Sequence, residues 1–169
     1  MSAGITVLYA TVSGKTKQFA QTVRERLLHA GVEAEVHNVA RYSAARLRQN
    51  DTVLIFATNW GAGAPPPDAV EFCHSLEDPR LKLTHLKFAV FELSSRLKVK
   101  VGGCGLRIDA ALRARGAKAL LAVVTSDRRS YAPFEAWYAE IARALHVGAA
   151  RRASAANPEL ESPVARLRK

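Results

Sequence analysis

The sequence contains little of what metal sites, disulfide frameworks and membrane spans require. It has only two cysteines, Cys73 and Cys104, and their separation matches no metal-binding or redox motif. The five histidines are scattered without ligand spacing, which argues against a metal site. No apolar run approaches the roughly 18 residues that a membrane span needs. We therefore expect a globular protein with two reduced thiols, no metal and no membrane contact.

Motifs of two enzyme classes and of secretion are also missing. The pattern G-x-S-x-G does not occur, so Ser13 lies in no nucleophile elbow. Residues 14–16 read Gly-Lys-Thr, but Tyr9 stands where a Walker motif requires its first glycine. No signal peptide precedes Ile5, where strand-like sequence begins. We expect a cytoplasmic protein, with an organellar matrix as the alternative.

Acidic residues are few compared with basic ones. The chain has 25 Lys and Arg against 15 Asp and Glu, a net charge of +10. Before Val147 there are 20 basic and 13 acidic residues, so most of the excess lies on the main body. A positive field of this kind favours anionic partners such as an acidic protein, RNA or an anionic ligand. Solubility alone is the alternative explanation.

What the chain does contain is a regular alternation of strand-like and helix-like segments. Short apolar runs predict strands at 5–9, 33–38, 52–57, 86–91 and 119–124. Apolar residues at helical spacing predict helices at 17–30, 44–49, 68–76, 106–115 and 132–145. Residues 92–103 are expected to form a long basic loop and 125–131 a polar loop. The alternation predicts an α/β domain over residues 1–146, a parallel sheet with helices on both faces, followed by a flexible basic tail at 147–169.

Small hydroxyl residues and a glycine follow the first strand directly. Thr11, Ser13 and Thr16 supply hydroxyls around Gly14, and a helix begins at this point. Hydroxyl groups and free N–H groups at a helix N-terminus suit an anion such as a phosphate. The alternative is an ordinary strand-to-helix turn with Ser and Thr as capping residues.

Four segments together resemble the flavodoxin-like FMN domain, and in particular the FMN modules of diflavin reductases such as cytochrome P450 reductase, sulfite reductase and nitric oxide synthase. The segments are TVSGKT at 11–16, NWGAGAPPPDAVEF at 59–72, LKFAVFELSSRLKVKVGGCGLRIDAAL at 86–112, and GAK at 116–118 with Asp127, Phe134 and Trp137 beyond it. They follow the family's order and spacing from Ile5 to about Leu145. The resemblance implies a flavodoxin-like three-layer sandwich with a five-stranded parallel sheet in the order 2-1-3-4-5.

The resemblance also implies a set of FMN-binding residues. For the phosphate, they are Thr11, Val12, Ser13, Gly14, Lys15 and Thr16. For the isoalloxazine ring, they are Thr58, Asn59, Trp60, Gly61, Gly63, Leu93, Ser94, Ser95, Lys98 and Asp127. Trp60 stands where the family has a ring-stacking aromatic, and an aromatic face would hold the ring and exclude water.

The ring side of this pocket departs from the family pattern. Lys98 replaces a second stacking aromatic, and Glu92–Ser95 replaces the sequence G-L-G-N. A lysine beside the ring would favour the anionic reduced flavin, so we expect weaker FMN binding and a more positive reduction potential. Basic residues at Lys15, Arg96, Lys98, Lys100, Arg128 and Arg129 would surround this edge, where relatives are acidic.

Two functions remain open on the sequence. The first is an FMN-binding electron carrier that receives electrons from a separate reductase and meets an acidic surface on its redox partner. The second is a degenerate flavodoxin-like scaffold with weak or no FMN binding, which serves as a basic interaction subunit for an acidic protein or RNA. RNA is suggested by charge alone, because the basic residues are not interleaved with the aromatic residues on which single-stranded nucleic acid stacks.

Overall fold

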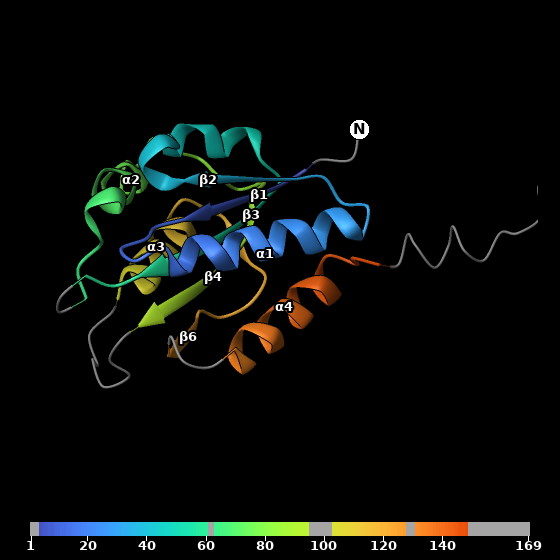
Figure 1. The fold of residues 1–169 in the computed structure, drawn as a ribbon. Helices are drawn as coiled ribbons and strands as arrows, with labels where there is room; N and C mark the ends of the chain where they lie inside the picture. Colours follow the sequence, from blue (N-terminus) through green and yellow to red (C-terminus); the bar gives the residue numbers. More distant parts are fainter. Residues whose placement is uncertain (1–3, 61–62, 95–102, 128–130, 149–169) are drawn as a thin grey trace, which may run out of the picture.

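The computed structural model describes residues 4–60, 63–94, 103–127 and 131–148, and strands and helices alternate along them (Figure 1). The strands are β1 (Ile5–Tyr9), β2 (Ala34–Asn38), β3 (Thr52–Thr58), β4 (Lys87–Ser94), β5 (Lys118–Ala119) and β6 (Val124–Asp127). The helices are α1 (Lys15–His29), α2 (Val70–Leu76), α3 (Cys104–Ala114) and α4 (Ala132–Ala144). Three short 3-10 helices add η1 (Val39–Arg41), η2 (Ala44–Gln49) and η3 (Pro67–Ala69). Within these ranges no helix has the length and apolar character to cross a membrane.

The strands form one parallel sheet in the order β2-β1-β3-β4, with β5 and β6 both beside β4. The predicted strand order 2-1-3-4-5 is therefore confirmed. The fifth position is divided, however: β5 pairs with Lys87 and Phe88, and β6 pairs with the stretch from Phe91 to Ser94. The single strand predicted at 119–124 was wrong in its bounds. β5 and β6 lie at the edge of the sheet and, in the part of the chain that the structure describes, pair only with β4. The interruption of pairing at residues 120–123 therefore costs few hydrogen bonds.

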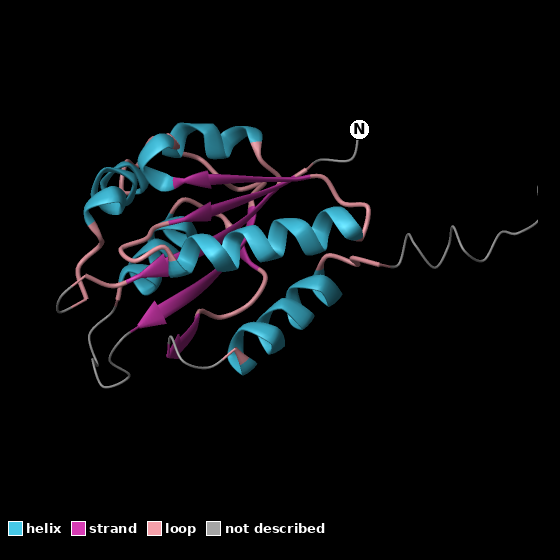
Figure 2. Ribbon diagram, in the orientation of Figure 1, coloured by secondary structure: helices cyan, strands magenta, loops and turns pink. Residues whose placement is uncertain are grey.

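Helices cover both faces of the sheet, as the alternation predicts (Figure 2). On the face of α1 and α4, five aromatic side chains form the centre of the core: Phe19, Phe56, Phe91, Phe134 and Trp137. Most of their rings meet at tilted or edge-on angles, with 4.6 Å between the centroids of Phe19 and Phe134, whereas Phe19 and Phe56 are stacked. Arg26 of α1 joins the two helices, because its guanidinium binds Glu135 at 2.6 and 2.8 Å and lies over the Phe134 ring.

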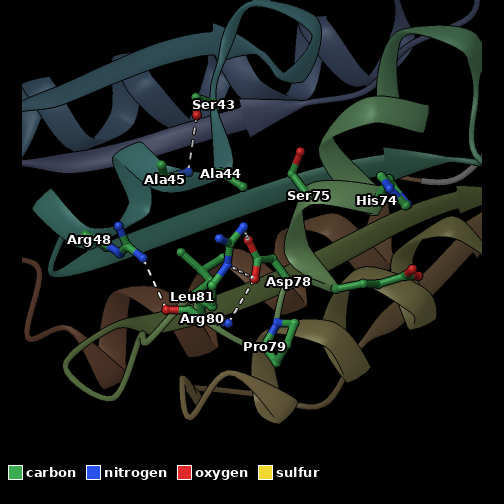
Figure 3. A pocket seen from close by; sticks show the side chains of 11 residues that line it. Ser43, Ala44, Ala45, Arg48, His74, Ser75, Asp78, Pro79, Arg80 and Leu81 are labelled. Carbon is green, nitrogen blue, oxygen red and sulfur yellow. Dashed lines mark hydrogen bonds and ion pairs between the residues drawn. The ribbon is translucent and has the colours of Figure 1, made fainter.

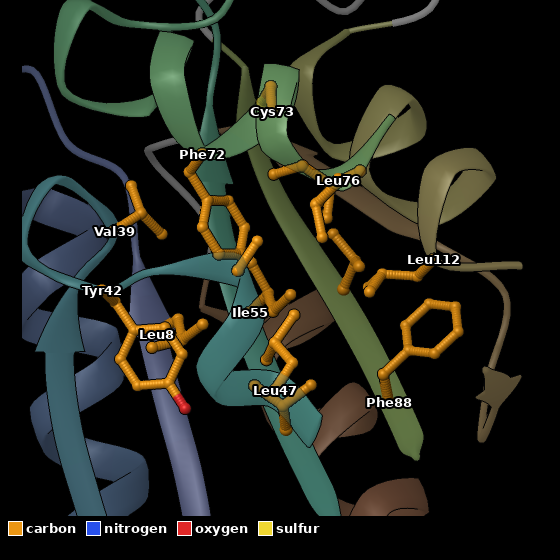
Figure 4. Close-up of a cluster of buried hydrophobic side chains, with 14 of the residues drawn as sticks. Leu8, Val39, Tyr42, Leu47, Ile55, Phe72, Cys73, Leu76, Phe88 and Leu112 are labelled. Atoms are coloured by element: carbon orange, nitrogen blue, oxygen red, sulfur yellow. The ribbon is translucent and has the colours of Figure 1, made fainter. Parts of the chain in front are cut away.

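The opposite face packs against α2, α3 and η2 and is mainly aliphatic (Figure 4). Leu8, Ile55 and Phe88 come from three neighbouring strands and are fully buried there. Leu47 of η2 packs over them, and Ser43 begins that short helix by accepting a hydrogen bond from the N–H of Ala45, as predicted. Because successive strand residues point to opposite faces, both cores come from the same strands.

Two segments predicted as loops belong to strands. Glu92–Ser94 continue β4, and residues 125–127 lie in β6, because these two stretches pair with each other. Thr58 extends β3 to the same level and donates its Oγ1 proton to the carbonyl of Leu93 at 3.1 Å. The backbone groups of these residues form hydrogen bonds with neighbouring strands of the sheet, and a local sequence pattern does not show such pairing. The sheet is therefore longer at the carboxyl ends of its central strands than the sequence indicated.

Candidate functional site

The carboxyl ends of the strands bring the predicted FMN-binding segments to one edge of the sheet. Tyr9, Phe56, Phe91 and Val124 lie in one row across β1, β3, β4 and β6. The loop after β1 leaves directly from this row. In the next rows Thr58 pairs with Leu93 and then Ser94 with Asp127. Ligands of open parallel sheets bind outside this edge. The predicted residues Gly61, Ser95 and Lys98 lie outside the described residues, as do Arg96, Lys100, Arg128 and Arg129.

The loop after β1 forms a turn that presents helix N–H groups to solvent. Gly14 has φ = 83° and ψ = −3°, a left-handed conformation that favours glycine, and α1 begins at the next residue. No side chain caps this helix. Among the described residues, no hydrogen bond engages the N–H groups of Lys15 and Thr16. With Val12 and Ser13 exposed beside them, the turn offers an open concentration of donors to an anion.

Two hydroxyls of this loop hold the loop itself. The Oγ1 of Thr11 accepts the N–H of Gly14 at 2.8 Å. The Oγ1 of Thr16 is buried and donates to the carbonyl of Ala10 at 2.7 Å. The sequence led us to expect these hydroxyls among the phosphate ligands. In the structure they fix the turn that exposes the N–H groups, and their direct role toward phosphate stays a prediction.

Asp68, a residue that we did not include in the predicted site, supports the same loop. Its Oδ2 accepts the N–H of Thr11 and the side-chain amide of Asn38, each at 3.1 Å. The carboxylate thereby joins the start of η3 to the ends of β1 and β2. Its other oxygen, Oδ1, is buried without a hydrogen bond. In the sequence, Asp68 follows a Pro-rich stretch and predicts only the start of a helix, so its contact with Thr11 could not be expected.

The loop after β3, next to β1 in the sheet, carries an exposed aromatic side chain. Trp60 is 51% exposed. Its backbone pairs with Ala64 through two hydrogen bonds of 2.9 and 3.1 Å, and Gly63 turns between them with φ = 107°. This small hairpin keeps the indole at the surface, although Trp usually buries most of its area. An exposed aromatic at the ligand edge of a parallel sheet is a suitable platform for a planar ring.

The end of β4 contributes less surface than predicted. Leu93 is fully buried in the aromatic core, so its side chain faces away from the edge. Ser94 is 5% exposed, and Asp127 is partly buried on the adjoining strand. From these residues a ligand would meet mainly backbone.

Behind the loop after β3 lies a buried polar cluster centred on Glu92. Glu92 is 1% exposed, and its carboxyl interacts with the side chain of Asn59 and with the backbone N–H groups of Gly105 and Leu106 in the first turn of α3. Asn59 in turn accepts the N–H of Cys104 at 2.7 Å. Burial raises the pKa of Glu92, and these hydrogen bonds oppose that shift.

A further hollow lies elsewhere on the molecule. A cavity of about 740 Å³ lies between η2 and the end of α2, at the opposite end of α2 from the phosphate loop (Figure 3). Its charged side chains have partners: Arg80 binds Asp78 at 2.9 Å, and Arg48 donates to the carbonyl of Arg80 at 3.2 Å. No buried polar atom among its lining residues lacks a partner. Nothing there points to a particular ligand.

Comparison with known proteins agrees with this geometry. The model of the family described as Flavodoxin matches residues 7–139, which is most of the chain. The chain belongs to the Flavodoxin family. Members of this family bind FMN, as the resemblance implied.

The flavodoxin family includes curated relatives of much greater length. The chain is 28% identical over 142 residues to the NADPH sulfite reductase flavoprotein alpha-component of Shewanella sp. (strain MR-7), covering 83% of this chain and 24% of that protein. It is 30% identical to the same component from Zymomonas mobilis, covering 83% of this chain and 23% of that protein. The chain therefore spans about a quarter of the length of these relatives.

Solved flavodoxin structures share the fold. A short-chain flavodoxin associated with a bacterial microcompartment superimposes with a TM-score of 0.74 at 20% identity, over 85% of this chain and 97% of that one. Flavodoxin 1 from Bacillus cereus gives a TM-score of 0.69 at 24% identity, over 87% and 95% of the two chains. At these identities the likeness establishes the fold.

The described residues fit a flavin mononucleotide on chemical grounds. The open N–H groups at the start of α1 suit its phosphate, and the exposed Trp60 suits its ring. Both are on the ligand edge of one sheet, after neighbouring strands. Two supporting residues, Asp68 and Glu92, emerged only from the structure.

Proposed function

We propose that this protein is an FMN-binding electron carrier of the flavodoxin type that works between a separate reductase and an acceptor protein. The observation that carries the proposal is that an uncapped helix N-terminus and an exposed aromatic follow the neighbouring strands β1 and β3 at the carboxyl edge of the sheet. When bound, FMN supplies the redox chemistry, and the protein supplies binding, orientation and shielding from water.

Each part of the described site has a separate task. The N–H groups of Lys15 and Thr16 would bind the phosphate, aided by the positive end of the α1 dipole. Lys15 is exposed and has no ion pair among the described residues, so its charge adds to the same attraction. Trp60 would stack on the ring and exclude water from one of its faces.

The partner proposal follows from charge. Relatives named as an alpha-component belong to multicomponent sulfite reductases, and this chain matches only about a quarter of such a component. From the charge we propose that the reductase and the acceptor present acidic contact surfaces to the +10 chain. Association should weaken as ionic strength rises. A cytoplasmic location is proposed on the basis of the buried free thiols Cys73 and Cys104.

Flavin uptake tests the proposal. Purified protein mixed with excess FMN should retain flavin through gel filtration, seen as absorbance near 450 nm. Riboflavin, which lacks the phosphate, should be retained much less. Trp60→Phe should keep most of the FMN affinity and Trp60→Ala should lose much of it, because only the first retains an aromatic face.

A protein that stays colourless at micromolar excess of FMN would overturn the proposal. No observation favours the alternative of a scaffold without flavin, but that result would lead back to it. Equal retention of FMN and riboflavin would show that the loop after β1 does not bind the phosphate.

A further inference from the structure

Glu92 packs against two glycines, Gly103 directly before α3 and Gly105 in its first turn. A Cβ atom at Gly103 would lie 1.9 Å from Oε1 of Glu92, and a Cβ at Gly105 would lie 2.9 Å from its Oε2. Side chains at either position would therefore overlap the carboxyl group. In the resemblance described above, the family has a glycine where this chain has Glu92. The carboxyl of Glu92 therefore fits here because both neighbouring positions lack a side chain.

The carboxyl group joins two parts of the predicted ring site. On one side it meets Asn59, the residue next to Trp60 in the loop after β3. On the other it meets the backbone N–H groups of Gly105 and Leu106, in a helix that no residue of its own caps. A carboxyl at this position satisfies donors at the N-terminus of α3 that would otherwise be orphaned.

Asn59 also binds the start of α3 directly. Its Oδ1 accepts the N–H of Cys104 at 2.7 Å, so the loop after β3 is bonded to the first residue of α3 directly and through Glu92. Oε1 of Glu92 is buried and has no hydrogen bond. Burying a carboxyl oxygen without a hydrogen bond costs free energy of folding, so such a group calls for an explanation.

We propose that Glu92 is a positioning residue for the flavin ring, which acts by fixing the loop that carries Trp60 to the end of β4 and the first turn of α3. This inference rests on the proposed FMN-binding function. Glu92 acts through Asn59 and the N–H groups of α3. Its effect on flavin is therefore one of geometry.

The test compares FMN affinity in wild type, Glu92→Gln, Glu92→Ala and a control. Glu92→Gln keeps the size and a hydrogen-bonding oxygen, and its FMN affinity should stay close to that of wild type. Glu92→Ala removes the connection and should weaken FMN binding by about tenfold or more, as expected for losing buried hydrogen bonds that order a site. Val90→Ala is the matched control, because Val90 is fully buried on the same face of β4 two residues earlier.

Two further measurements separate positioning from general loss of stability. In FMN-free protein, amide hydrogen exchange over residues 103–112 should be faster in Glu92→Ala than in Val90→Ala, while α1 keeps similar protection. Gly105→Ala should weaken FMN binding in wild type and weaken it by less in Glu92→Ala. The added Cβ would lie 2.9 Å from Oε2 and 3.2 Å from Cδ of Glu92, and Glu92→Ala removes both of these atoms while it keeps the Cβ, also at 2.9 Å.

The outcomes are distinguishable. If wild type does not bind FMN, the proposed function fails. If wild type binds FMN and Glu92→Ala binds it as tightly as Val90→Ala, the function stands and the positioning role is overturned. Glu92→Gln as weak as Glu92→Ala would also overturn it, because a neutral isostere should rescue a purely geometric role.

Discussion

The structure and the sequence-based prediction assign different roles to the hydroxyl of Thr16 in the phosphate loop. The sequence predicts a direct phosphate ligand. In the structure Thr16 is 1% exposed and donates to the carbonyl of Ala10 at 2.7 Å, across the base of the turn. Thr16→Val keeps the shape and removes the donor. The Ala10 carbonyl then remains buried without this partner, so we expect a cost of about 1–3 kcal/mol in the free energy of unfolding.

Thr22 provides a matched control on the same helix. Its hydroxyl donates to the carbonyl of Gln18 at 2.9 Å, but on the exposed side of α1. Thr22→Val should therefore change stability by no more than about 0.5 kcal/mol, as is usual for surface substitutions. Thr16→Ser retains the donor and should lie between wild type and Thr16→Val. Urea unfolding of FMN-free protein, followed by circular dichroism, measures all three variants.

Flavin binding then distinguishes an anchor from a ligand. If Thr16 anchors the loop, Thr16→Val should lower both stability and FMN affinity, while riboflavin affinity changes little. If Thr16→Val is as stable as Thr22→Val and only FMN affinity falls, the hydroxyl serves the phosphate directly. That result would refute the reasoning from the Ala10 hydrogen bond.

Three other predictions concern the supports of the site and the fold. Asp68→Ala removes the acceptor of the Thr11 N–H and should cost about 1.5–3 kcal/mol in urea unfolding, with weaker FMN binding; unchanged affinity would mean that the loop is held without it. Gly116→Ala should cost about 1–2 kcal/mol, because Gly116 has φ = 94° and a Cβ would lie 2.8 Å from Cγ2 of Thr84; an unchanged melting temperature would contradict this. Burial raises the pKa of Glu92 above its ordinary 4.5, so folding disfavours the charged form of this group relative to the unfolded chain. Its contribution is complete below the unfolded pKa and is lost as pH rises through the folded pKa, so Glu92→Gln should gain stability relative to wild type from pH 4.5 upward in urea titrations; parallel pH profiles would show that Glu92 does not titrate in this way.

The architecture can be predicted from the sequence, because the relevant signals are local. The apolar run Ile5–Tyr9, the spacing of Phe19 and Val23 in the next helix, and Gly14 at the turn each depend on residues close together in the chain. Repeated along the chain, such signals specify a parallel sheet with helices on both faces. The ligand edge and the site segments on it follow from that topology.

The residues that support the site could not be predicted from the sequence, because their contacts join distant parts of the chain. The sequence places Glu92 in a loop, but pairing with β6 makes it a strand residue, and glycines at the start of α3 leave room for its carboxyl. Asp68 looked like a helix start, yet it bonds Thr11, 57 residues earlier. Thr16 looked like a ligand, and the fold turns its hydroxyl toward Ala10. A local pattern shows which groups are available, whereas the partner that each finds depends on which segments the fold brings together.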